Sequence, residues 1–179
     1  DEQREDLGII LGATLTLLAL IIGFSISMAS SRYDQRKNLE EAEANAIGTE
    51  MLRADLLPPA DAANVRSLLG AYLDQRILFY INRDDTRQPQ IDQSTSQLQT
   101  DLWVAVRGPA TAQPTPVMVL VLAGMNDVIN SQGYTQAAFW NRLPVAVWWL
   151  MVAIALCSNA LFGFQSRDGK ATRKLAFVL

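Results

Sequence analysis

Residues 7–29 read LGIILGATLTLLALIIGFSISMA, which is 23 consecutive residues without a charged side chain. At a rise of about 1.5 Å per residue, a helix of this length reaches roughly 34 Å and crosses a hydrocarbon core of about 30 Å with little tilt. Glycine and hydroxyl residues interrupt its Leu and Ile, and such residues in a membrane helix usually face protein rather than lipid. The sequence therefore predicts a transmembrane helix that packs against neighbours.

The small and polar residues of this helix gather along one line. At 100° per residue, ten such residues lie within about 60° of one line along the helix surface, and this line continues beyond the apolar segment. The ten residues are Gly12, Thr16, Gly23, Ser27, Ser30, Ser31, Asp34, Asn38, Glu41 and Asn45. We call this set the polar stripe. It has two interpretations, a close contact with another helix or the lining of a water-filled path. The sequence leaves both open.

Composition excludes several classes of protein. The 179 residues are 50% apolar and carry a net charge of -3, with no basic patch that would indicate a nucleic-acid partner. Because there is no histidine and only one cysteine, Cys157, we expect no enzyme, no cofactor and no metal site. Four carboxylates come close together in sequence, and we interpret them as a solvated helix face rather than a cation site: Glu40, Glu41, Glu43 and Glu50.

The sequence of residues 31–140 predicts a helical domain. The first helix should continue to the prolines at 58 and 59, and Asp61 should cap the next helix. In that helix we expect Arg66, Asp74 and Arg76 to lie off the apolar face. Residues 82–95 predict a loop and 97–106 a third helix. Residues 117–129 predict a fourth helix rather than a strand, because a single strand would have no partner.

A second apolar segment at 143–164 predicts a second span, with tryptophans near its beginning. Asn159 is its one strongly polar interior residue, and we expect it to face another helix. The fold class is therefore an all-α membrane protein with a membrane-proximal helical bundle inserted between two spans. Its parts are 1–30 with the first span, the domain 31–140, the second span 141–164, and a basic loop with the start of a further span at 165–179.

Charge predicts which side of the membrane the domain occupies. The segment 165–174 is basic, and short basic segments stay in the cytoplasm, so the domain should be extracytoplasmic. The basic residues Arg32, Arg36 and Lys37 favour the opposite orientation. The chain starts with DEQRED and ends with LAFVL, which predicts an internal piece of a longer protein.

Several longer strings resemble bacterial membrane proteins labelled bestrophin-like: SRYDQRKN at 31–38, EANAIGTEMLRADLLP at 43–58, VRSLLGAYLDQR at 65–76, LQTDLW at 98–103, LAGMNDVIN at 122–130 and NRLP at 141–144. The resemblance implies four spans, with cytoplasmic basic segments before residue 1 and after the second span. The positions that match the most specific strings are Arg32, Tyr33, Asp34, Glu43, Asn45, Gly48, Thr49, Arg53 and Asp55. We call these the motif residues.

The resemblance also implies ion conduction, by analogy of fold. Bestrophins proper are pentameric anion channels, and their pore motif is not found in this chain. The hypothesis is a homo-oligomer in the bacterial inner membrane that contacts the lipid bilayer and passes inorganic ions along the polar stripe. The alternative is a structural or accessory subunit without transport activity. Asp34 and Glu41 on the stripe favour the first hypothesis, because a packing surface does not require charges.

Overall fold

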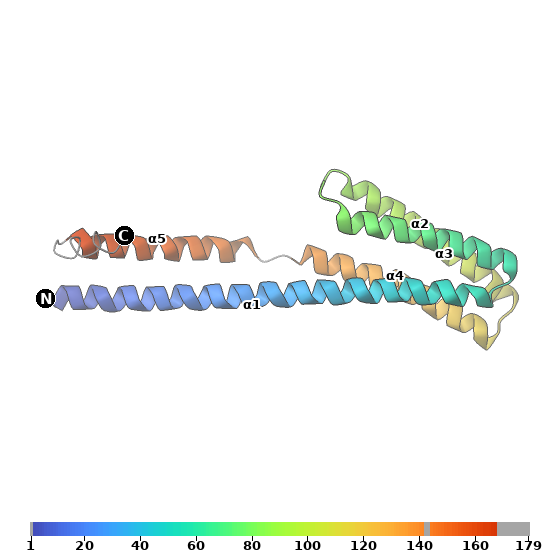
Figure 1. Cartoon of the computed structure of the whole chain (residues 1–179), viewed down its shortest axis with the longest axis horizontal. Coiled ribbons are helices and arrows are strands. Elements are labelled where there is room, and N and C mark those ends of the chain that lie inside the picture. The colour runs from blue at the N-terminus through green and yellow to red at the C-terminus, as the bar shows by residue number, and fades with distance from the viewer. Residues whose placement is uncertain (1, 142–143, 168–179) are drawn as a thin grey trace, which may run out of the picture. The chain divides into compact units, whose positions relative to one another are not determined.

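The structure is a computed structural model that describes residues 2–141 and 144–167. In this part of the chain every regular element is helical, so the prediction of an all-α fold is confirmed. The elements are α1 (Glu2–Arg53), the 3-10 helix η1 (Ala54–Leu56), α2 (Pro59–Ile81), α3 (Gln88–Ala112), α4 (Pro116–Trp140) and α5 (Val145–Arg167) (Figure 1).

Helix α1 runs for 52 residues without interruption. At about 1.5 Å per residue it is roughly 78 Å long, more than twice the thickness of a hydrocarbon core. The predicted continuation past the apolar segment is therefore confirmed. Two stretches, Gly8–Leu56 and Pro116–Ala160, contain segments long and apolar enough to cross a membrane. The predicted basic loop and further span lie almost entirely at 168–179, outside the described residues.

The chain divides into two compact units, one formed by residues up to Asp34 together with those from Asn141 onward, the other by Gln35–Trp140. In the first unit, most large apolar side chains are exposed. Ser25 and Ser158 are buried there, and each hydroxyl donates to a carbonyl one turn earlier in its own helix, at 2.8 and 2.9 Å. Arg32 Nη1 donates to the carbonyl of Asn141 at 2.8 Å.

The second unit, which we call the domain, is a helical bundle. Helices α2 and α3 lie side by side as a hairpin, and α3 also packs against α4 (Figure 1). Its core consists of apolar side chains from α1, α2, α3 and α4 and from the segment that contains η1. The core residues are Ile47, Ala54, Leu57, Ala62, Val65, Leu69, Tyr72, Leu102, Val106, Ala110, Met118, Val121, Met125 and Val128. Burial of this common core holds the helices together, because hydrophobic burial is the dominant favourable term in folding.

Helix boundaries differ from the predictions in three places. Helix α2 begins at Pro59, so Asp61 is not its cap but lies in its first turn, where a negative charge complements the helix dipole. Helix α3 begins at Gln88, so residues 88–95 are not a loop, and it continues through Pro109 to Ala112. Helix α4 extends to Trp140, well past the predicted end at 129.

The early start of α3 has a local cause. Within the turn at 82–87, the side chain of Asn82 accepts from the Asp84 amide at 3.1 Å, and Asp84 accepts from the Thr86 amide and hydroxyl at 2.9 and 2.6 Å. These contacts close a compact turn. In its first two turns α3 buries only Ile91 and Thr95, which is one residue per turn. This spacing of buried residues is too sparse to be recognised as a helix from sequence.

Candidate functional site

The polar stripe lies on the surface of the chain. Its ten residues, from Gly12 to Asn45, are all exposed. Three glycines of α1 lie on this side of the helix, Gly12, Gly23 and Gly48, and a side chain at any of them would meet open space. Glycine inside a helix costs about 1 kcal/mol relative to alanine. Nothing in the described chain explains these glycines, and they would allow a close approach of another helix.

The opposite side of α1 is buried in the domain. Glu43, Ile47 and Glu50 recur at intervals of four and three residues, and Ala54 of η1 continues this spacing four residues later; all four residues are buried. At 100° per residue their direction is about 180° from that of the stripe. Within the domain, α1 therefore buries one side and exposes the stripe residues Asn38, Glu41 and Asn45 on the other.

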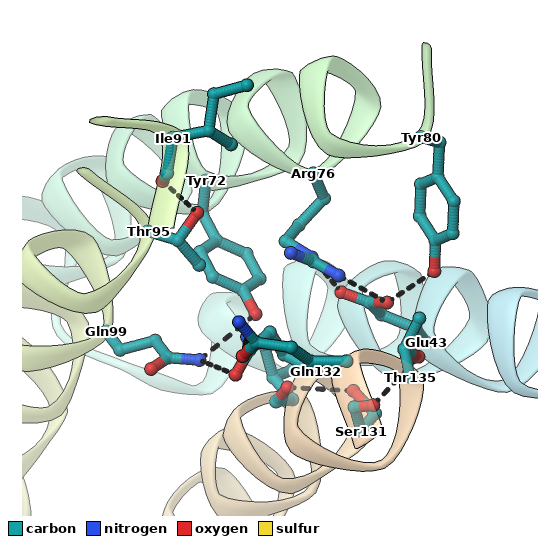
Figure 2. Close-up of polar contacts among 12 residues, drawn as sticks. Glu43, Tyr72, Arg76, Tyr80, Ile91, Thr95, Gln99, Ser131, Gln132 and Thr135 are labelled. Carbon is teal, nitrogen blue, oxygen red and sulfur yellow. Dashed lines mark hydrogen bonds and ion pairs between the residues drawn. The ribbon is translucent and has the colours of Figure 1, made fainter. Parts of the chain in front are cut away.

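Glu43 is the centre of a buried polar cluster (Figure 2). Arg76 of α2 donates from Nε to Glu43 Oε1 and from Nη2 to Oε2, the second at 3.3 Å. Tyr80 donates its hydroxyl to Glu43 Oε2 at 2.6 Å. The glutamate and the arginine are each 1% exposed. A two-point arginine–carboxylate contact of this kind fixes the rotation of both helices and is strong because it is charge-assisted.

Aromatic rings surround this ion pair. The Arg76 guanidinium lies 4.3 Å from the centroid of the Phe79 ring and 5.6 Å from that of Tyr80. Phe139 of α4 contacts both rings edge to face, at 5.2 and 5.8 Å. Arg36 of α1 lies over Phe139 at 5.1 Å and donates to the carbonyls of Ala138 and Phe139 at 3.1 and 3.5 Å. The arginine thus caps the carboxyl end of α4, where the helix dipole favours a positive charge.

The cluster keeps its groups in fixed protonation states. Burial lowers the pKa of Arg76, but the hydrogen bond and the charge of Glu43 outweigh burial, and the pKa lies above its usual value. Burial raises the pKa of Tyr80, and the hydrogen bond to Glu43 raises it further. Burial also raises the pKa of Tyr72 to about 12. At neutral pH these groups neither gain nor lose a proton, so the cluster is suited to structure rather than to acid–base chemistry.

A second set of polar contacts joins α2, α3 and α4 (Figure 2). The amide of Gln99 donates to the hydroxyl of Tyr72 at 3.4 Å and to the side-chain oxygen of Gln132 at 3.2 Å. Gln132 in turn donates to Gln136 at 2.7 Å. Because buried polar groups require partners, these contacts fix the relative register of the three helices.

Glu50 differs from Glu43 because its carboxylate is not satisfied. It is 0% exposed, and neither oxygen has a hydrogen-bond partner among the described residues. The nearest cation, Nη1 of Arg53, is 3.8 Å from Oε2. Burial raises the pKa of Glu50 to about 7, in spite of the opposing charge of Arg53. The interpretation of the four carboxylates as a solvated face is thus correct for Glu40 and Glu41 and wrong for Glu43 and Glu50.

Four of the motif residues make side-chain contacts, and the other five are exposed. Arg32, Glu43 and Arg53 make the contacts described above, and Asp55 pairs with Arg66 at 2.6 Å. The other motif residues are exposed, namely Tyr33, Asp34, Asn45, Gly48 and Thr49. The expected contact of Asn159 with another helix is not found among the described residues, where its side chain is exposed and donates to the carbonyl of Ala155 in its own helix at 2.9 Å.

The expectation for Arg76 was wrong, and sequence reasoning missed Tyr72, Tyr80 and the two glutamines as site residues. A signal for Arg76 was present, because Val65, Leu69, Tyr72, Arg76 and Phe79 follow one another at intervals of four, three, four and three residues and are all buried. The charge of Arg76 obscured that pattern. The glutamines carry no such signal, since they are common on solvated helix faces.

Within the described residues, no group of three or more His, Cys, Asp or Glu side chains is arranged to hold a metal ion. No protein-family model matches the chain, and neither the curated proteins nor the solved structures with which it was compared contain a match.

Proposed function

We propose that this chain is an integral protein of the bacterial inner membrane, that it assembles as a homo-oligomer, and that the polar stripes of several α1 helices surround an ion pathway. The observation that carries the proposal is the exposure of all ten stripe residues on the side of α1 opposite to the buried one. Hydroxyl groups exposed on a membrane helix require polar neighbours, which water and other copies of the chain would supply.

The chemistry of the stripe favours a pathway for cations. Thr16 donates its hydroxyl to the carbonyl of Gly12 at 2.8 Å, which leaves the lone pairs of its oxygen free for water or a cation. Asp34 is exposed beyond the apolar segment, so an oligomer would carry a ring of carboxylates at this level. Such rings concentrate cations. The resemblance to bestrophin-like membrane proteins is compatible with ion conduction but does not specify the sign of the ion.

The proposed orientation places the domain outside the cytoplasm. A cysteine at Asp85, an exposed residue in the turn between α2 and α3, should react with a membrane-impermeant thiol reagent in intact cells. The native Cys157 is exposed and is first replaced by alanine. Labelling that occurs only after lysis would place the domain in the cytoplasm instead.

Selectivity should depend on Asp34. If the stripe lines the pathway, Asp34→Lys reverses the charge at its mouth and should shift the reversal potential of the reconstituted protein under a salt gradient. The shift should be largest at low ionic strength, because salt screens exposed charges. Asp74→Lys, an exposed aspartate on α2, is the control and should leave the reversal potential unchanged. The oligomer is sized in detergent before both measurements.

The alternative function is a structural or accessory subunit, and the three aligned glycines of α1 favour it. Each has open space around it, as a close helix–helix contact requires. The same experiment separates the two functions. An absence of current from wild-type oligomers over a range of voltages and ions, with Asp34→Lys weakening assembly, would replace the ion pathway by the accessory role.

A further inference from the structure

The contact between α1 and α4 in the domain is built around Glu50. Gly124 of α4 is buried against this side chain, and a methyl group at Gly124 would overlap the Glu50 carboxylate and the Arg53 guanidinium. Gly124 therefore leaves the space on α4 that the ends of the Glu50 and Arg53 side chains occupy. The result is a carboxylate with no exposed surface and, among the residues that the structure describes, no hydrogen-bond partner closer than the Arg53 guanidinium at 3.8 Å.

Such an environment suits a neutral carboxylic acid better than a carboxylate. An ionised group that leaves water must be paired and hydrogen-bonded, or it loses several kcal/mol of solvation. Glu43, two turns earlier on the same side of α1, shows the satisfied arrangement, with both oxygens bound by Arg76 and Tyr80. Glu50 has only Arg53 at 3.8 Å, on its own helix.

Two charged groups act on Glu50 besides its burial. Arg53 is one turn further along α1 and stabilises the ionised form, whereas Asp127 of α4 opposes it. Burial is the largest influence and moves the pKa from 4.5 to about 7. Ionisation therefore falls in the physiological range of pH only while α1 and α4 remain packed.

We propose that Glu50 is a proton-binding site that controls the packing of α1 against α4, closed when the carboxyl group is protonated and loosened when it ionises. This regulation rests on contacts within Gln35–Trp140 and not on the proposed ion pathway, so either proposal can fail without the other. Loosening of this contact would separate the α1 segment around Glu50 from α4 inside the domain.

The sign of the pH dependence follows from the raised pKa. Below pH 4.5 the closed and the open forms both hold the proton, and above about pH 7 both have lost it. Between these values only the closed form is protonated, so closure weakens as the pH rises. From pH 6 to pH 8 the ratio of open to closed molecules should increase about tenfold, as the two pKa values require.

Hydrogen exchange on the full chain in detergent tests the proposal. The α1 segment 46–53 and the α4 segment 118–128 should lose protection between pH 6 and pH 8 in the wild type, beyond the intrinsic pH dependence of exchange. Glu50→Gln, which stays neutral, should abolish the additional loss. Glu40→Gln removes an exposed carboxylate that lies on the same helix but outside the polar stripe, and it should behave like the wild type.

Two further variants make the test independent of Glu50 itself. Asp127→Asn should move the pH midpoint of the loss to lower pH, and Arg53→Gln should move it to higher pH, because each removes one charge that acts on Glu50. Equal pH dependence in the wild type and Glu50→Gln would overturn the proposal. If Glu50→Gln does not fold, an unchanged midpoint in both of the other variants would overturn it.

Discussion

Replacing Arg76 by methionine should lower the free energy of unfolding of the full chain by about 3–5 kcal/mol, the usual effect of removing one partner from a buried ion pair. Glu43 would stay buried with only Tyr80 as a hydrogen-bond partner, and two helices would lose the contact that fixes their rotation. Chemical denaturation in detergent, followed by the helical circular dichroism signal, measures the change.

Two variants test this explanation. Arg66→Met removes the partner of Asp55, but both side chains of that pair are about half exposed, so the effect should stay below about 1 kcal/mol. The double variant with Glu43→Leu and Arg76→Met removes both charges and should recover much of the lost stability. Equal losses in Arg76→Met and Arg66→Met would show that the buried pair has no special role.

Leu102→Ala should lower the free energy of unfolding by about 2–5 kcal/mol, the range for a large-to-small change in a packed core. Leu102 of α3 is 0% exposed and belongs to the core shared by the helices of the domain. Val104→Ala, two residues further along the same helix, changes an exposed side chain and should have an effect within about 0.5 kcal/mol. Similar losses in both variants would contradict the observed orientation of α3.

The continuity of α1 could be predicted because the sequence between residues 7 and 53 contains no proline and keeps helical periodicity. The boundaries of α3 and α4 could not, since Ile91 and Thr95 are the only buried residues at the start of α3 and no apolar run marks it. The part of α4 beyond residue 129 contacts other helices through Phe139 and contains the buried Thr135, and local sequence does not encode such tertiary packing.

The burial of Glu43, Glu50 and Arg76 could not be predicted from the sequence, for a different reason. The periodicity that identifies a core side of a helix counts apolar residues, so Glu43, Glu50 and Arg76 were assigned to solvent although their spacing fits the buried positions. Only the structure shows that an arginine on α2 faces a glutamate on α1. The exposure of the polar stripe likewise required the structure, because its residues are compatible with a contact inside one chain.

The cap that Arg36 forms on the end of α4 has a consequence for how this protein was assembled. Because Arg36 contacts the carbonyls of Ala138 and Phe139, the domain begins and ends at neighbouring positions. Adjacent chain ends are the geometrical condition under which one domain is inserted into another without disturbing either. Residues 35–140 therefore have the form of a module that evolution could gain, exchange or lose between two apolar helices, as a unit with its own core.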